Sequence, residues 1–243
     1  QKFLADLLPD LRKNLDSWTG RSWVKEAGMF WQVGHDDGME FNIASRQTKN
    51  ILSGAPSYRP SFNSYMWADL QALAKISHLL GDHDAATSYE KQAGALKDTM
   101  QKKLWDPRRK FFLAMFRDDE EDGEGNRIQK NTRIYETGKF AGSPHGREEA
   151  GYVPWSFNLP DPGYEEAWKF LMDPAYFFAD FGPVTVERND PLFLLKNSCC
   201  WWSGQSWPFA TTQTLKGLAN LLHNYSQDHV SREDYYKLLH IYA

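Results

Sequence analysis

The chain of 243 residues alternates helical stretches with long irregular ones. In residues 61–80, apolar side chains such as Leu70 and Leu73 recur every three or four positions and fall near one face of a helix, which Gly81 would end. Residues 84–104 repeat this period with a narrower apolar stripe. Together the two segments predict an antiparallel pair of helices, an αα-hairpin.

A second hairpin of the same kind is predicted near the end of the sequence. Residues 208–224 begin with a proline, which is favoured in the first turn of a helix, and continue with helical periodicity. Residues 231–242 follow and open with a Ser-x-x-Asp capping signal. Shorter helices are predicted at 3–17, where Pro9 limits the first turn, and at 163–172.

Long irregular stretches, rich in Gly, Pro, Asp and aromatic residues, occupy 28–60 and 106–160. Loops of this length in a compact domain are usually functional. A short strand pair is predicted between 110–116 and 132–136, and the acidic run 118–126 is interpreted as a solvated loop tip because it lacks the ligand spacing of a calcium loop. The predicted fold class is therefore mainly α.

Aromatic residues make up 15% of the chain, with 10 Trp, 11 Tyr and 15 Phe. A large core would use many of these rings. Trp and Tyr beside carboxylates and amides are also typical of sugar sites, where ring faces pack on C–H surfaces and polar groups bind hydroxyls. Composition alone leaves both interpretations open.

The net charge and the lengths of the apolar runs argue against nucleic-acid and membrane partners. The formal net charge is -4 and no basic stripe is visible, so no nucleic-acid partner is expected. No run of about 18 apolar residues occurs, so no membrane segment is expected. No signal-peptide pattern opens the chain, and its start at Gln1 resembles a mature or trimmed end. A sequon at Asn224 is compatible with secretion, so secreted and cytoplasmic locations both stay open.

The two cysteines, Cys199 and Cys200, are adjacent, which disfavours a disulfide between them. No CxxC or HxxxH spacing accompanies them, so buried free thiols are expected rather than a metal site. The sequence indicates neither a metal nor another cofactor, and it leaves the oligomeric state open.

Three carboxylates lie within five residues after the aromatic pair Phe30-Trp31, in the segment His35-Asp36-Asp37-Gly38-Met39-Glu40. Acids packed beside rings on a loop can have their pKa values pushed apart, so that one carboxyl stays protonated as a general acid while another stays ionised. This segment is therefore the candidate source of the acid catalyst, with Trp31 as a candidate substrate contact. A surface cluster of turn-forming residues is the alternative.

Three tryptophans surround a glycine turn just before the helix predicted from Pro208, in the segment Trp201-Trp202-Ser203-Gly204-Gln205-Ser206-Trp207. Indoles at a helix start present flat apolar faces and N–H donors to a ligand, and the Gln205 amide can bridge two hydroxyls. A core cluster is the alternative for any single tryptophan, but not for all three.

Two further segments combine rings with polar groups. Carboxylates precede Tyr152 and Trp155 in residues 145–155, and Asn63 and Tyr65 lie where residues 58–65 lead into the first predicted hairpin. Asn63 and Tyr65 are predicted to lie at the mouth of a cleft, and all four side chains are predicted to contact substrate.

Four motifs from these segments follow one another along the sequence. They are Asp-Gly-Met-Glu, Arg-Pro-Ser-Phe-Asn-Ser-Tyr before a helix, Gly-Tyr-Val-Pro-Trp, and Trp-Ser-Gly-Gln-Ser-Trp-Pro-Phe-Ala-Thr. This order resembles the (α/α)6 six-hairpin glycosidases, especially glycoside hydrolase family 63 and the mannosylglycerate-hydrolase-like group. The resemblance spans about residues 28–243, and the Trp-x-Gly-x-x-Trp-Pro element is its most specific part.

The resemblance implies an exo-acting, inverting glycosidase that cleaves a terminal or short-oligosaccharide bond. In that group a Gly-hydrophobic-Asp motif supplies the general acid. Gly38-Met39-Glu40 matches it here, which points to Glu40, and the change from Asp to Glu keeps Asp37 in contention. The resemblance also implies substrate contact for Trp202, Gln205 and Trp207.

A six-hairpin toroid has twelve helices, whereas the pattern predicts only about half of them, and the last runs to the end of the sequence without a C-cap. We therefore expect residues 1–243 to form a single (α/α)6-type domain that lacks its C-terminal helices. An inverting glycosidase needs a second carboxylate roughly 6.5–9.5 Å from the acid. The resemblance places this general base on a later loop, beyond residue 243, with Glu148, Glu149 and Glu187 as the stand-ins within the chain.

Two other functions stay open at this point. A sugar epimerase on a similar α-toroid would need a His acid and base, but neither His35 nor His145 has a second His nearby in sequence. A non-catalytic carbohydrate-binding or structural module is the other alternative. It is favoured if Asp37 and Glu40 both turn to bulk solvent, away from the pocket of Trp207.

Overall fold

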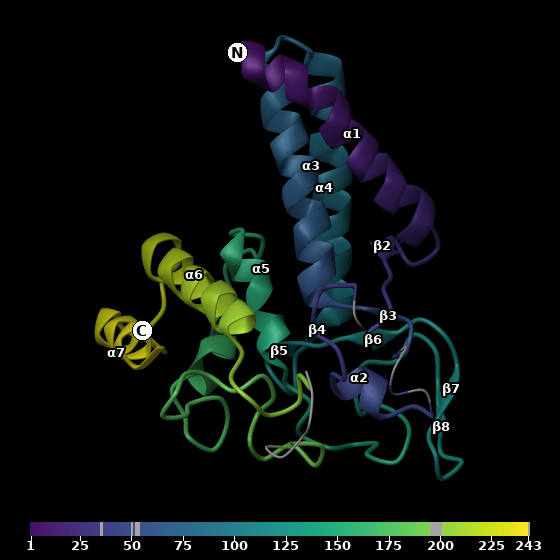
Figure 1. Ribbon diagram of the computed structural model, residues 1–243, viewed down its shortest axis with the longest axis vertical. Helices are drawn as coiled ribbons and strands as arrows, with labels where there is room; N and C mark the ends of the chain where they lie inside the picture. Colours follow the sequence, from purple (N-terminus) through teal and green to yellow (C-terminus); the bar gives the residue numbers. More distant parts are fainter. Residues whose placement is uncertain (35, 50, 52–53, 195–200, 243) are drawn as a thin grey trace.

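Two long antiparallel helices, α3 (Pro60–Leu79) and α4 (His83–Leu104), form a hairpin that projects from the rest of the molecule (Figure 1). The computed structural model describes residues 1–34, 36–49, 51, 54–194 and 201–242. The α4 helix is capped by Asp82, whose carboxylate accepts a hydrogen bond from the Ala85 amide at 3.2 Å. The hairpin predicted from the apolar period is confirmed.

Helix α1 (Lys2–Ser22) lies along this hairpin, with the N-terminus at its far end (Figure 1). The Trp18 ring meets Phe62 of α3 edge-on at 5.1 Å, and Leu15 is buried. The prediction of a helix over 3–17 ended too early, and the helix also continues through Pro9. Packing on α3 stabilises the last turns, and this contact has no local signal in the sequence.

The second hairpin consists of α6 (Pro208–Asn224) and α7 (Arg232–Tyr242). Ser231 and Asp234 form the predicted capping box: the Asp234 amide donates to the Ser231 hydroxyl at 3.2 Å, and the Ser231 amide donates to the Asp234 carboxylate at 2.8 Å. Both predicted helices are confirmed. Helix α6 lies between α7 and α5 (Val153–Ser156), and η1 (Glu149–Tyr152) precedes α5 (Figure 1).

The segment predicted as a helix at 163–172 is instead a short 3-10 helix, η2 (Glu165–Phe170). Its buried side chains include Ala167 and Phe170, which are three residues apart. This spacing suits three residues per turn rather than 3.6.

The strands are two-residue antiparallel pairs rather than a continuous sheet. They are β1 (Trp23–Val24) with β2 (Met29–Phe30), β3 (Ser57–Tyr58) with β6 (Met115–Phe116), β4 (Trp105–Asp106) with β5 (Phe111–Phe112), and β7 (Glu120–Glu121) with β8 (Arg127–Ile128).

The predicted pairing of 110–116 with 132–136 is confirmed in part. An antiparallel bridge joins Met115 to Arg133, and the Ile134 amide donates to the Ala114 carbonyl at 3.0 Å beside it, but these residues form no continuous strand, and the strand partner of Met115 is β3. Pairing across such a distance in sequence has no local signal. The acidic run 118–126 forms the β7–β8 hairpin.

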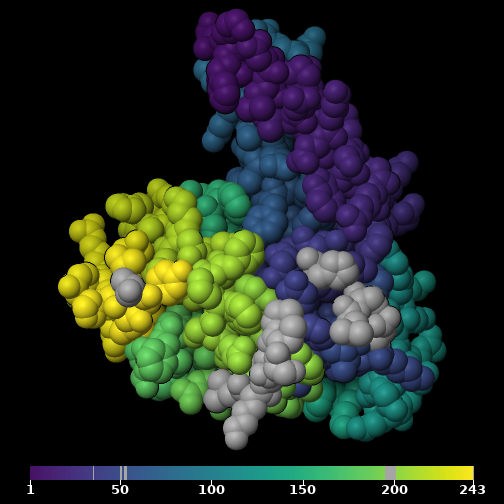
Figure 2. Space-filling view, viewed as in Figure 1, coloured from purple at the N-terminus to yellow at the C-terminus, as the bar shows by residue number. Residues whose placement is uncertain are grey.

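The largest buried cluster lies where the hairpins meet the β4–β5 pair. Its rings pack edge to face, as Trp155 does on Trp168 at 5.5 Å and on Phe112 at 5.6 Å. In the space-filling view, α1 and the α3–α4 hairpin stand above a broader body that contains the other elements (Figure 2). Within the described residues, no helix is long and apolar enough to cross a membrane.

Candidate active site

The loop between β2 and α2 (Ile43–Arg46) places Glu40 against the tryptophan-rich segment before α6. The Glu40 carbonyl accepts a hydrogen bond from the Trp202 amide at 3.0 Å, and the Glu40 carboxylate accepts one from the Trp202 indole Nε1 at 3.1 Å. Glu40 is half-buried. The structure therefore brings an acid candidate into contact with one of the three tryptophans.

The tryptophans form two separate stacks. Trp202 is stacked on Trp207 with ring centroids 5.1 Å apart and planes at 16°, and the edge of Phe209 closes this stack at 6.0 Å. Trp201 is instead stacked on Phe41 at 5.0 Å. The carboxylate loop and the tryptophan segment thus interlock through rings as well as hydrogen bonds.

Asp37, the other acid candidate, is fixed in the interior. Its Oδ1 pairs with Arg59 Nη1 at 3.0 Å and accepts a hydrogen bond from the Met39 amide at 3.2 Å. Its Oδ2 accepts one from the Ser61 hydroxyl at 2.5 Å. The side chains of Asp37 and Arg59 are 0% and 1% exposed. This carboxylate is held by three donors and is not open to a substrate.

A small cavity lies behind Trp202, with room for about one water molecule. It is lined by Met39, Arg59, Glu148, Glu149, Ala150, Thr185, Trp202 and Ala210. Burial raises the pKa of Glu148 to about 7, against the opposing effects of the Arg59 charge and of the Ile43 amide, which donates to Glu148 at 3.0 Å. Glu148 therefore titrates near neutral pH.

Glu149 is still more isolated from water and from partners. Its side chain is buried, and neither carboxylate oxygen accepts a hydrogen bond from a residue that the structure describes. Burial raises the pKa of Glu149 well above the ordinary value, although the nearby Thr214 hydroxyl opposes this shift. Burial therefore favours the protonated form of Glu149.

An apolar groove of about 500 Å³ runs past the outer face of the tryptophan segment. It is lined by Ala179, Phe181, Val184, Gly204, Gln205, Ser206, Trp207 and Pro208. Phe181 is 84% exposed, which is unusual for a ring of this size. Gln205 and Trp207, two predicted substrate contacts, share this groove, whereas Glu40 and Trp202 do not line it.

Comparisons with known proteins identify the family of this domain. The profile of the mannosylglycerate hydrolase MGH1-like glycoside hydrolase domain matches residues 1–243. The chain belongs to this family. A search of curated proteins finds no match.

Among solved structures, a protein named sialidase is 33% identical to this MGH1-like domain with a TM-score of 0.80, and the match covers 98% of this chain and 19% of that one. The GH63 mannosylglycerate hydrolase from Thermus thermophilus, in complex with Tris, is 15% identical with a TM-score of 0.51, over 77% of this chain and 37% of that one. An uncharacterized conserved protein from the same organism is 15% identical with a TM-score of 0.51, over 76% and 38%.

The last two similarities show the fold alone. The mainly α fold class and its relation to the (α/α)6 toroid are confirmed, and this MGH1-like domain spans less than two fifths of each of these chains.

Four of the predicted substrate contacts are buried; besides Trp202, which is 6% exposed, they are Asn63, Tyr152 and Trp155. The Asn63 side chain is buried and bridges both backbone groups of Phe30, donating to its carbonyl at 2.9 Å and accepting from its amide at 2.8 Å. Tyr152 and Trp155 are each 0% exposed. Because these side chains are buried, they account for the packing of the domain better than for contact with a sugar.

Two other predicted contacts are only partly buried. Tyr65 donates a hydrogen bond from its hydroxyl to Gln213 of α6 at 2.6 Å. Trp31 lies under the guanidinium of Arg117 at 3.8 Å, a cation–π contact outside the groups described above. The structure therefore unites Glu40, Trp202, Trp207 and Gln205, and it leaves Trp31 apart from them.

The three glutamates considered as stand-ins for the base are all buried. Glu187 is 0% exposed and pairs with Arg147 at 2.7 Å, while His145 lies 3.7 Å from the same carboxylate. His35, Cys199 and Cys200 lie outside the described residues.

Sequence reasoning missed Arg59 and Phe181. Arg59 holds Asp37 and lines the cavity beside Glu148. Nothing in its neighbours distinguishes it from a surface arginine, because the partner lies 22 residues away. Phe181 did not stand out in a sequence with many aromatic residues. Its place between Asp180 and Gly182 in a polar turn could have indicated exposure.

Proposed function

We propose that this domain takes part in hydrolysis of a terminal or short-oligosaccharide glycosidic bond, with inversion at the anomeric carbon. The observation that carries the proposal is the contact between Glu40 and Trp202, which puts a half-buried carboxylate beside the Trp202–Trp207 stack. Rings pack on the C–H faces of sugars, and a carboxyl beside a bound sugar can protonate its glycosidic oxygen.

In this proposal Glu40 is the general acid. Its carboxyl gives a proton to the glycosidic oxygen as the C–O bond breaks, so that the leaving sugar departs as an alcohol. A second carboxylate takes a proton from the water that attacks the anomeric carbon from the opposite face. The two hydrogen bonds between Glu40 and Trp202 orient the acid before the substrate binds.

Asp37 is the second candidate for the acid. Its two oxygens already accept three hydrogen bonds, and its partner Arg59 also donates to the Met39 carbonyl at 3.3 Å. These contacts suit a residue that fixes the carboxylate loop so that Glu40 stays in place. We therefore rank Glu40 first.

The general base, in this proposal, lies outside residues 1–243. The buried positions of Glu148, Glu149 and Glu187 support this, because a base must reach a water on the open face of the sugar. The test is turnover by a purified polypeptide of these 243 residues whose intact mass matches 28.1 kDa. It should be inactive, and hydrolysis at ordinary enzymatic rates would place the base inside the chain.

A non-catalytic binding module is the alternative function. It would be favoured by carboxylates turned to bulk solvent, whereas Glu40 is half-buried against Trp202 and Asp37 is buried. The test of the proposed function is a screen of the full-length protein against aryl glycosides and small disaccharides, with product anomers followed by NMR. An initial product of the opposite anomeric configuration supports inversion, and an initial product of the same configuration overturns it. Binding without any turnover supports the binding module.

A further inference from the structure

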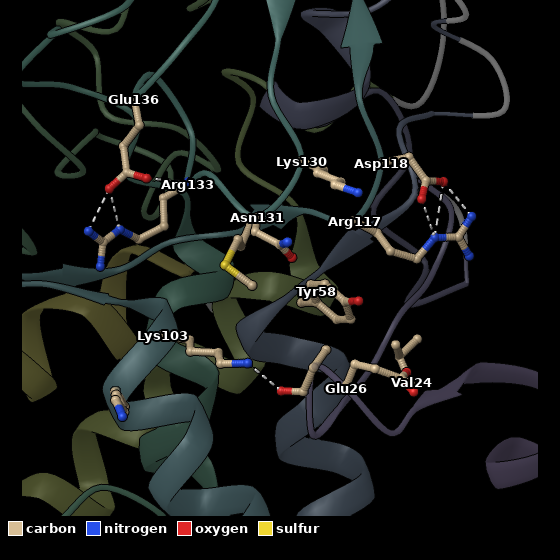
Figure 3. A pocket seen from close by; sticks show the side chains of 13 residues that line it. Val24, Glu26, Tyr58, Lys103, Arg117, Asp118, Lys130, Asn131, Arg133 and Glu136 are labelled. Atoms are coloured by element: carbon tan, nitrogen blue, oxygen red, sulfur yellow. Dashed lines mark hydrogen bonds and ion pairs between the residues drawn. The ribbon is translucent and has the colours of Figure 1, made fainter.

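A second pocket opens on the molecule and is shown from close by in Figure 3. This basic pocket has a volume of about 720 Å³, within the range of about 300–1,000 Å³ found for small-molecule sites. It is lined by Val24, Glu26, Ala27, Tyr58, Lys102, Lys103, Met115, Arg117, Asp118, Lys130, Asn131, Arg133 and Glu136. None of Glu40, Trp202 and Trp207 is among them.

The charges of the basic pocket do not cancel. Arg117 pairs with Asp118 and Arg133 pairs with Glu136, and these two pairs lie on opposite sides of the space in Figure 3. Three lysines remain against one glutamate, Glu26. Lys103 donates to the Ala27 carbonyl at 2.7 Å, and none of the three lysines forms an ion pair with a residue that the structure describes. A surplus of positive charge in a protein with a net charge of -4 favours an anionic ligand.

The basic pocket also contains hydroxyl and amide groups suited to a sugar. Tyr58 is only 2% exposed, its hydroxyl has no hydrogen-bond partner among the described residues, and this oxygen is not fully buried. Burial raises the pKa of Tyr58, so the hydroxyl keeps its proton and can donate. The exposed amide of Asn131 lies in the same wall, on a residue whose φ is 60°.

Tyr58 and Arg59 connect this pocket with the carboxylate loop. They are consecutive, and Tyr58 lines the basic pocket whereas Arg59 lines the cavity beside Glu148. Successive side chains of an extended segment point to opposite faces, so the start of α3 separates two sites.

We propose that the basic pocket binds an acidic saccharide of one or two rings. The lysines 102, 103 and 130 receive its carboxylate, and the Tyr58 hydroxyl, the Asn131 amide and the Glu26 carboxylate bind its hydroxyl groups. The choice of a saccharide rests on the proposed function, whereas the choice of an anion rests on the charges of this pocket.

The test is isothermal titration calorimetry of the full-length protein with D-glucuronate, D-glucose and inorganic sulfate. Glucuronate should bind, more weakly as ionic strength rises, and glucose should bind much less. Lys130→Gln should weaken glucuronate binding about tenfold, as expected for one lost charged hydrogen bond, and Tyr58→Phe should weaken it by less. Lys91→Gln, which removes an exposed charge from α4 outside the pocket, should have no effect.

Each other outcome overturns the proposal or one part of it. Absence of glucuronate binding, or equal binding by wild type and Lys130→Gln, overturns the site. Sulfate that binds as tightly as glucuronate overturns the saccharide and leaves a simple anion site. Trp207→Ala should leave glucuronate affinity unchanged, since a loss there would place the ligand in the groove instead. Because the readout is binding, failure of the proposed hydrolysis would leave this result interpretable.

Discussion

At the scale of single residues, the buried pair of Asp37 and Arg59 is the strongest electrostatic feature of the candidate site. Asp37→Asn leaves the Arg59 charge buried without its partner, so we expect a loss of about 3–5 kcal/mol in the free energy of unfolding. Urea denaturation measures it. Asp6→Asn is the control: Asp6 and its partner Lys2 are 62% and 89% exposed, so its loss should be about 0–1 kcal/mol. Equal losses would contradict this description of the pair.

Glu148 predicts how stability depends on pH. Its pKa is about 7 in the folded chain against 4.5 in the unfolded chain, so between these values the folded state holds the extra proton. The contribution of Glu148 to the free energy of unfolding is therefore fully present below about pH 4.5. It decreases as the pH rises through 7, by up to about 3 kcal/mol.

The measurement is unfolding of wild type and Glu148→Gln at pH 5 and pH 8. The glutamine can still accept the Ile43 hydrogen bond, so the variant should gain stability relative to wild type at pH 8 compared with pH 5. A constant difference between the two proteins would show that Glu148 does not titrate in this range.

The sequence predicted which residue types form the candidate site better than it predicted their positions in space. Glu40, Trp202 and Trp207 lie together as expected because motif order carries that information. Asn63 and Trp155 sit in the core, since a ring or an amide near a helix start is equally consistent with packing. Only tertiary contacts distinguish the two.

At the scale of elements, two glycines give opposite predictions. Gly94 lies inside α4 with nothing within 4 Å of an added Cβ, so Gly94→Ala should stabilise the protein by about 0.5–1 kcal/mol. A Cβ at Gly151 of η1 would meet the Phe111 ring at 2.2 Å and the Phe112 carbonyl at 2.6 Å. Gly151→Ala should therefore destabilise it, by about 1–3 kcal/mol. Thermal unfolding of both variants is the check, and a stable Gly151→Ala would argue against the close approach of η1 and β5.

Long, periodic helices were predictable from the sequence, and most of the strands were not. The α3, α4, α6 and α7 helices carry their own periodicity, with a proline in the first turn of α3 and α6 and a side-chain cap at the start of α4 and α7. The pairing of β3 with β6 joins residues far apart in sequence, and each strand has only two residues, so it depends on tertiary contacts. Strands of two residues are too short to show the alternation of apolar and polar side chains that predicts a strand.

At the scale of the whole molecule, the candidate site joins segments that are far apart in sequence. If the groove beside Trp207 binds sugar, Trp207→Ala should weaken substrate binding by about 1–3 kcal/mol through lost ring contact. Trp23→Ala, at an exposed ring on β1, is the control and should leave binding unchanged. An equally large drop in melting temperature for Trp207→Ala would instead support a core role for this ring.

The most direct test of the account is the turnover of Glu40→Gln in the full-length protein, on a glycoside that the wild type hydrolyses. Glutamine keeps nearly the same shape and removes the acidic proton, so kcat should fall by about 10²–10⁴-fold while the melting temperature stays unchanged. If Glu40→Gln instead retains most of its activity, Glu40 is not the general acid, and the assignment passes to Asp37 should Asp37→Asn lose turnover while still folded.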